Sequence, residues 1–417
     1  MKNIIRINLL YHLHENIFAQ QEVNTGRQIE LDLLKSFTII CCLIGAHICD
    51  EFIFDFDNSL VWTQSYVFGR VLGAPIFMFS MGFTMMYTTH HTAGDMFWRA
   101  IKLLTFGQTL NIFRYAIPYY WGAQLDPAYY NPQQVLNFSS DILQLAGLAF
   151  IVMAITRALK LSTALTLLIA IGMSLLGTFL TGVETNNYMV NQALGLLWPT
   201  HTESYYPLFN WFIFIAGGQW MGSIYRHINN KKAFFSIAIP IGILTISAYF
   251  YLQLYTSQTY LGALGDNLSR YCWLHLGEAL FIMSFIPMLI GISYLITTYI
   301  QHHLSEEVIT HLQFPSCHIN KYYSVSWGVI TIGSTMFNLH NTSDYMVTWM
   351  ICTLITSMIV MVYVRHFEEW VDDFVGRYDW IFIITVFAIT LYMAYYAYAT
   401  CEVMPNFLNN YLDNIKL

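Results

Sequence analysis

The chain has 417 residues, of which 56% are hydrophobic, 17% aromatic and only 10% charged. Because a soluble globular domain carries about 25% charged residues, this composition excludes a soluble enzyme and predicts an all-α, polytopic membrane protein. The formal net charge of −7 matters less than the positions of the cations along the chain, and no nucleic-acid partner is expected.

Apolar runs of membrane-spanning length recur along the sequence, where about 20 residues suffice for one helix to cross a bilayer. We predict a transmembrane bundle of about 11 helices over 27–400, between an interfacial segment at 1–26 and a short tail at 401–417. The predicted helices cover residues 33–53, 66–88, 101–121, 141–157, 161–182, 207–225, 234–255, 271–299, 322–340, 344–364 and 379–400.

The distribution of Lys and Arg predicts the orientation, because cytoplasmic loops carry an excess of these residues. With the amino terminus in the cytoplasm, fourteen of the eighteen Lys and Arg residues lie inside or at inner helix ends. The carboxyl terminus is then outside, and a bacterial inner membrane is the expected location. The longer outer loops are rich in aromatic and amide side chains, which suit sugars but are also ordinary interfacial anchors.

The first predicted helix carries His47 in its outer half. At about 1.5 Å per residue, His47 lies roughly 21 Å beyond Leu33 in a hydrocarbon core roughly 30 Å thick. An ionisable side chain at that depth is costly, so it usually has a function or a buried partner. The same reckoning places further polar residues at this depth, from five predicted helices: Asp50, Arg70, Gln108, Asn111, Arg114, Asp141, Gln144, Arg270, His275 and Glu278.

Polar groups from five helices at one depth predict a polar chamber that is open to the outside. The alternative is that each group makes an ordinary hydrogen bond between helices. His47 and Asp50 share a helix face by their i,i+3 spacing, and a histidine beside a carboxylate can act as a general base. His275 with Glu278 is a rival pair of the same spacing.

Two arginines at the same depth have two open interpretations. Arg70 and Arg114 could stabilise a developing oxyanion or bind an anionic acceptor. They could equally form ion pairs with Asp50 or Asp141. No metal is expected, because no trio of suitable ligands occurs at metal-binding spacing, and the seven cysteines form no CxxC pair.

The opening of the bundle resembles the first helix of the membrane acyltransferase superfamily, which includes acyltransferase-three and heparan-α-glucosaminide N-acetyltransferase-like proteins. The similarity lies in Arg27, the run ELDLLK at 30–35 and His47 near the outer end. Three further segments are similar to motifs of these proteins: GAPIFMFSMGFTMMY at 73–87, SDILQLAGLAFI at 140–151 and SYYPLFNWFIFIAGGQWMG at 204–222.

One departure concerns the spacing within the first helix. Eleven residues separate Lys35 from His47, where ten are usual in the superfamily. In a regular α-helix this spacing turns His47 about 120° away from the face of Lys35. Either a local bulge absorbs the extra residue or the two side chains lie on different faces.

The resemblance implies transfer of an acyl group, usually acetyl, from acetyl-CoA or another acyl-CoA in the cytoplasm to a glycan or other hydroxyl or amine acceptor outside. His47 would be the general base, with Asp50 or a neighbouring acid as its partner. The residues expected to bind substrate are Arg70, Asn111, Arg114, Asp141, Gln144, His275 and Glu278. The cations expected to hold the CoA phosphates are Lys35, Arg99 and Lys102.

The expected partners are membrane lipids and a glycan or lipid-linked acceptor, and a homo-oligomer is left open. A transporter or flippase for a polar or lipid-linked sugar is the alternative function, because it would use the same chamber. An odd number of helices without a detectable repeat disfavours it.

Overall fold

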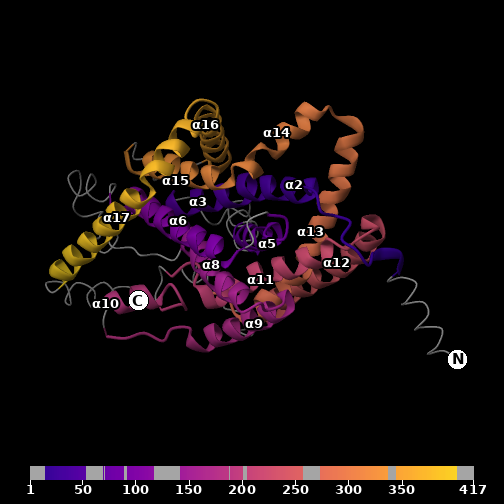
Figure 1. The fold of residues 1–417 in the computed structure, drawn as a ribbon, viewed down its shortest axis with the longest axis horizontal. Coiled ribbons are helices and arrows are strands. Elements are labelled where there is room, and N and C mark those ends of the chain that lie inside the picture. Colours follow the sequence, from indigo (N-terminus) through magenta and orange to yellow (C-terminus); the bar gives the residue numbers. More distant parts are fainter. Residues whose placement is uncertain are drawn as a thin grey trace.

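The computed structural model describes residues 15–52, 69, 71–88, 92–116, 141–186, 188–200, 204–256, 273–336 and 344–401. In these residues the chain forms helices and no strand, apart from an isolated antiparallel bridge between Phe18 and Ile228. The protein is therefore an all-α bundle, as the composition predicted (Figure 1).

The helices follow one another closely along the chain, and each predicted apolar run overlaps at least one of them. α10 and α14 lie outside the predicted runs. The elements are α2 (Ile29–Phe37), η1 (Thr38–Leu43), α3 (Ile44–Glu51), α5 (Ala74–Thr84), α6 (Ala93–Asn111), η3 (Ile112–Ala116), α8 (Ile142–Ala158), α9 (Thr163–Leu180), α10 (Tyr188–Leu194), α11 (Leu208–Tyr225), α12 (Lys231–Thr256), α13 (Leu276–His303), α14 (Glu306–Cys317), α15 (Ile319–Met336), α16 (Tyr345–His366) and α17 (Glu368–Cys401).

Several helices are long and apolar enough to cross a membrane, so the chain is an integral membrane protein. Among the described residues there are five such spans, and a sixth if Glu368–Phe374 and Gly376–Tyr392, bent by 69°, form one. Val71–Thr84 and Ile142–Ala158 are shorter apolar helices. The number of eleven spans and the orientation stay predictions. The five spans are Ile29–Cys49, Thr163–Leu180, Lys231–Leu252, Leu276–His303 and Tyr345–His366.

The first span is the central element of the bundle. It is 72% buried, whereas the other four spans are 17–44% buried and turn much of their apolar surface outward. α14 and α13 contact α2, while α15 and α16 contact α3. Figure 1 shows α14, α15 and α16 on one side of this helix and α5 with α11 on the other. Most side chains of the first helix are therefore buried against other parts of the protein.

α5 and α11 approach each other closely, because glycines in both helices leave room for the facing backbone. A Cβ atom on Gly82 would lie 1.9 Å from the Ile215 carbonyl oxygen, and one on Gly218 would lie 1.9 Å from the Phe79 carbonyl oxygen. Small residues at such contacts are typical of membrane helix pairs. Two of the segments that resemble the superfamily thus pack against each other.

The close contact makes a stability prediction. Gly218→Ala forces α5 and α11 apart, and we expect it to lower the free energy of unfolding by about 3 kcal/mol, at the upper end of overpacking effects. Gly172→Ala on α9 is the matched control, since nothing lies within 4 Å of its added Cβ. It should be neutral or stabilise by up to about 1 kcal/mol. Thermal unfolding in detergent measures both, and equal effects would contradict this packing.

Candidate active site

A π-helical turn positions His47 on the first helix. η1 lies between Lys35 and His47, and it connects α2 to α3 without ending the helix. An i→i+5 turn holds one more residue than an α-helical turn, and such bulges occur frequently at functional sites. The bulge that the spacing of eleven residues allowed is therefore present. A turn of this kind can accommodate the extra residue between Lys35 and His47.

Two aromatic rings of α15 enclose the imidazole of His47. The Trp327 ring is stacked on it, with centroids 3.9 Å apart and planes 24° apart. The Tyr323 ring meets it edge-on at 5.2 Å. His47 is 4% exposed, and its Nδ1 has no hydrogen-bond partner among the described residues. Ring contacts therefore hold the imidazole, and its Nδ1 is buried without a hydrogen-bond partner in the described part of the chain.

Arg114 lies in η3, beside this aromatic cluster. Its side chain is 7% exposed, and it forms ion pairs with Asp141 at 3.3 Å and with Glu51 at 3.7 Å. Its Cζ lies 3.2 Å from the centroid of the Trp327 ring, which is a cation–π contact. Of the two interpretations of Arg114, the structure shows the ion pair with Asp141.

Asp141 connects the arginine to the aromatic cluster. It is the N-cap of α8, where its Oδ1 accepts a hydrogen bond of 2.7 Å from the Ile142 backbone N–H. The same oxygen accepts a hydrogen bond of 2.5 Å from the Tyr323 hydroxyl. One contact circuit thus joins α3, η3, α8 and α15 around His47.

Two buried amides complete this end of the bundle. Gln144 is one turn beyond Asp141, is 5% exposed, and has no hydrogen-bond partner for either side-chain polar atom within the described ranges. It packs against Gly107, where an added Cβ would lie 3.0 Å from the Gln144 Cδ. Asn111, the last residue of α6, is 3% exposed. An unpartnered buried amide is costly. The substrate-binding role of Gln144 stays a prediction.

Other predicted site residues lie elsewhere or outside the described residues. Glu278 is fully buried and accepts a hydrogen bond of 2.9 Å from the Tyr249 hydroxyl of α12. His275 is the N-cap residue of α13. This pair therefore belongs to the α12–α13 contact and not to the circuit around His47. Arg70 and the side chain of Asp50 fall outside the described residues, so the partnership of His47 with Asp50 stays a prediction.

The three cations expected at the CoA phosphates have different partners in the structure. Lys35 pairs with Asp32 at 3.0 Å, on its own helix. Lys102 pairs with Asp379 of α17 at 2.7 Å. Arg99 lies 4.8 Å from the centroid of a ring on α8, that of Phe150. Arg99 has no carboxylate partner within the described part of the chain, and the phosphate role of all three stays a prediction.

The charged start of the first helix is a structural anchor. The buried Glu30 carboxylate accepts hydrogen bonds from the Tyr225 hydroxyl at 2.5 Å and the Lys231 Nζ at 2.6 Å. Asp32 accepts a hydrogen bond of 2.9 Å from the Ser316 hydroxyl of α14. Hydrogen bonds to the Cys317 sulfur and the Asp32 carboxylate raise the pKa of Arg27. These contacts fix α2 against α11, α12 and α14.

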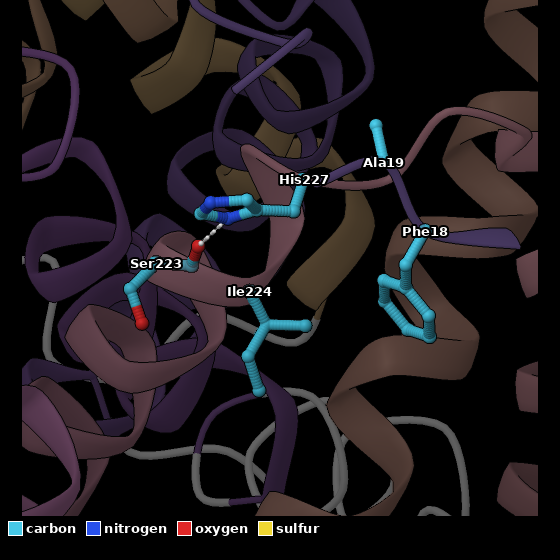
Figure 2. Close-up of a pocket in the computed structure, with 5 residues that line it drawn as sticks. All are labelled: Phe18, Ala19, Ser223, Ile224 and His227. Atoms are coloured by element: carbon cyan, nitrogen blue, oxygen red, sulfur yellow. Dashed lines mark hydrogen bonds between the residues drawn. The ribbon is translucent and has the colours of Figure 1, made fainter. Parts of the chain in front are cut away.

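A surface pocket of about 490 Å³ lies near this anchor, and Figure 2 shows the side chains that line it. Its floor is the end of α11, where His227 Nδ1 lies 3.0 Å from the Ser223 carbonyl oxygen. Phe18 and Ala19 form the other wall, and Ala19 N–H donates to the His227 carbonyl oxygen at 2.8 Å. The pocket adjoins Tyr225, the partner of Glu30, and so lies at the opposite end of the first helix from His47.

The apolar bundle, with a buried histidine and an ion-pair cluster at one end, fits the class of membrane-embedded acyltransferases that the motifs resemble. Residues 27–254, more than half of the chain, match the sequence model of the family described as heparan-alpha-glucosaminide N-acetyltransferase, catalytic. The chain therefore belongs to this family of acetyltransferases, as the motifs predicted. Comparison with curated proteins gave no match.

Sequence reasoning missed three residues of the site. Tyr323 and Trp327 lie beyond the matched residues 27–254, and Glu51 was not among the predicted site residues. Tyr323 and Trp327 are four apart and so share one face of α15. That spacing was visible in the sequence, but aromatic residues are common in membrane helices and nothing marked this pair.

The ion pair beside His47 predicts a measurable coupling. Arg114→Gln and Asp141→Asn should each lower the free energy of unfolding by about 3 kcal/mol, because each leaves a buried charge without its partner. Asparagine remains a good N-cap, so Asp141→Asn isolates the charge. The double variant should be at least about 1 kcal/mol more stable than the sum of the two effects predicts.

Arg377→Gln is the control for this cycle, because the Arg377–Asp373 pair is exposed. Its loss should change stability by less than about 0.5 kcal/mol. Chemical denaturation in mixed micelles measures all four variants. Additive effects of Arg114→Gln and Asp141→Asn would show that the two charges do not depend on each other.

Proposed function

We propose that this protein transfers an acetyl group from acetyl-CoA to a hydroxyl or amine of an extracytoplasmic glycan or lipid-linked acceptor, with His47 as general base. The observation that carries the proposal is the buried Nδ1 of His47, which has no hydrogen-bond partner among the described residues. Membership of an acetyltransferase family supplies the reaction class. A neutral imidazole nitrogen without a hydrogen-bond partner can accept a proton from a substrate hydroxyl or amine.

The transfer needs one proton acceptor that later returns the proton. His47 takes the proton of the acceptor O–H or N–H while the acceptor atom forms a bond to the thioester carbonyl carbon. The resulting tetrahedral oxyanion collapses, and the carbon–sulfur bond breaks. The CoA thiolate then takes the proton from the imidazolium, so that acetylated acceptor and CoA thiol leave a neutral His47.

The charges near His47 suit this cycle because the arginine is not an isolated cation. Arg114 is paired with Asp141 and Glu51, so two carboxylates offset its positive charge. Glu51 is one helical turn after His47 on the same face. Stacking on Trp327 restricts rotation of the imidazole before the substrates bind. Less rotational entropy is therefore lost when the ring takes its reactive orientation.

The predicted orientation assigns the two substrates to opposite ends of the bundle. Acetyl-CoA would enter from the cytoplasm, and Arg99 is the first of the three proposed phosphate contacts, since Lys35 and Lys102 would have to leave carboxylate partners. The acceptor would enter from outside. The chamber proposed there stays a prediction. Of the four longer outer loops predicted, at 54–65, 122–140, 183–206 and 256–270, the first two lie outside the described residues.

The proposed base can be tested directly. In proteoliposomes with acetyl-CoA and a glucosamine-type acceptor, His47→Ala should lower acceptor-dependent release of free CoA thiol by about 10²–10⁴-fold, the usual contribution of a general base. His303→Ala is the control, since this exposed residue contacts the Tyr299 ring on its own helix. It should keep activity within about twofold.

Full activity of His47→Ala would remove His47 from the mechanism. The same vesicles address the alternative function, since a transporter would move the sugar across the membrane without releasing CoA. Release of CoA that matches the acetylated acceptor mole for mole, without net sugar movement, is the result expected of an acetyltransferase.

A further inference from the structure

Trp327 carries a second buried nitrogen without a partner, in direct contact with His47. The residue is 2% exposed, and its indole Nε1 has no hydrogen-bond partner in the described part of the chain. A buried indole N–H usually donates to an acceptor, because a buried donor without a hydrogen bond costs free energy. Trp349 shows the ordinary case, since its Nε1–H donates to the Ile40 carbonyl oxygen at 3.1 Å.

The position of Trp327 relative to His47 suggests a chemical role for the indole nitrogen. The two rings are stacked at 3.9 Å with planes only 24° apart. One small tetrahedral group beside the stack can therefore contact both rings at their edges. The imidazole offers a proton acceptor, and the indole offers a hydrogen-bond donor that does not ionise.

The other donors beside the stack are paired with carboxylates or face away from its edge. Arg114 forms ion pairs with Asp141 and Glu51; its Nε makes no hydrogen bond among the described residues, but the guanidinium lies over the face of the Trp327 ring and not at its edge. The Tyr323 hydroxyl donates to Asp141. The indole N–H is thus the donor in contact with His47 that has no acceptor of its own among the described residues.

We propose that the Trp327 Nε1–H donates a hydrogen bond to the acyl oxygen of the donor, and that this bond is strongest when the oxygen becomes an oxyanion. The inference rests on the proposed function and deepens it. As the acceptor atom bonds to the carbonyl carbon, the C=O electron pair moves to the oxygen, and Nε1–H stabilises that charge without losing its proton. When the carbon–sulfur bond breaks, the pair returns and the C=O is restored.

Removal of a hydrogen-bond donor that acts mainly in the transition state lowers kcat and has little effect on substrate affinity. Trp327→Phe keeps an aromatic ring against His47 but removes the N–H. We expect kcat to fall about 10²-fold, as for loss of one oxyanion donor, with the KM for acetyl-CoA unchanged within about twofold. The assay is acceptor-dependent release of CoA thiol from proteoliposomes.

A second variant keeps the test valid if Trp327→Phe does not fold. Replacement of Trp327 by 3-benzothienylalanine preserves the shape of the indole and substitutes sulfur for the N–H. The same loss of kcat is expected. Trp198→Phe is the matched control, because it removes an indole N–H that donates to the Val183 carbonyl oxygen at 3.0 Å. Its kcat should be unchanged.

Each outcome decides the inference. Loss of kcat at constant KM in either variant of Trp327 supports it. Unchanged kcat in the benzothienyl variant overturns it, and so does a raised KM with unchanged kcat. If the Trp327 variants contradict the inference while His47→Ala is inactive in the same assay, only the role of Trp327 is refuted. If His47→Ala is fully active, the proposed function itself has failed.

Discussion

The buried guanidinium of Arg114 is the constraint on which the candidate site depends. A charge that is 7% exposed in a membrane bundle costs several kcal/mol unless it is paired. Asp141 and Glu51 supply the pairing, and Trp327 covers the guanidinium with an aromatic face. Because these partners belong to α8, α3 and α15, the contacts of the Arg114 guanidinium join three helices. His47 lies within that arrangement. It contacts the rings of Trp327 and Tyr323, which themselves contact Arg114 and Asp141.

The two ends of the first helix have different tasks. At the α2 end, Glu30 and Asp32 are bound by side chains of α11, α12 and α14, so their charges hold the bundle together. At the α3 end, His47 has a ring nitrogen with no acceptor or donor among the described residues. The charged motif that resembles the superfamily is therefore an anchor, and the proposed chemistry lies at the other end. The π-helical turn η1 lies between these two ends of the helix.

Much of this architecture could be predicted from the sequence, because a membrane leaves the backbone few choices. A long apolar run must satisfy its own hydrogen bonds and so becomes a helix. Depth along the helix indicated His47, Arg114 and Asp141, since charges at membrane depth are expensive. The order of the helices in space could not be predicted, and so Tyr323 and Trp327 of α15 were missed. The spacing between Lys35 and His47 allowed either a bulge or side chains on different faces, and it did not decide between them.

The central claim is that the acyl group is transferred beside the stacked rings of His47 and Trp327. A cryo-EM map of the protein with a non-transferable acetyl-CoA analogue tests it most directly. The account predicts that the carbonyl oxygen of the analogue lies within about 3.2 Å of the Trp327 Nε1, with space beside the His47 Nδ1 for the acceptor atom. Density for the acyl end in the pocket of Phe18 and His227, or a lipid chain beside His47, would contradict it.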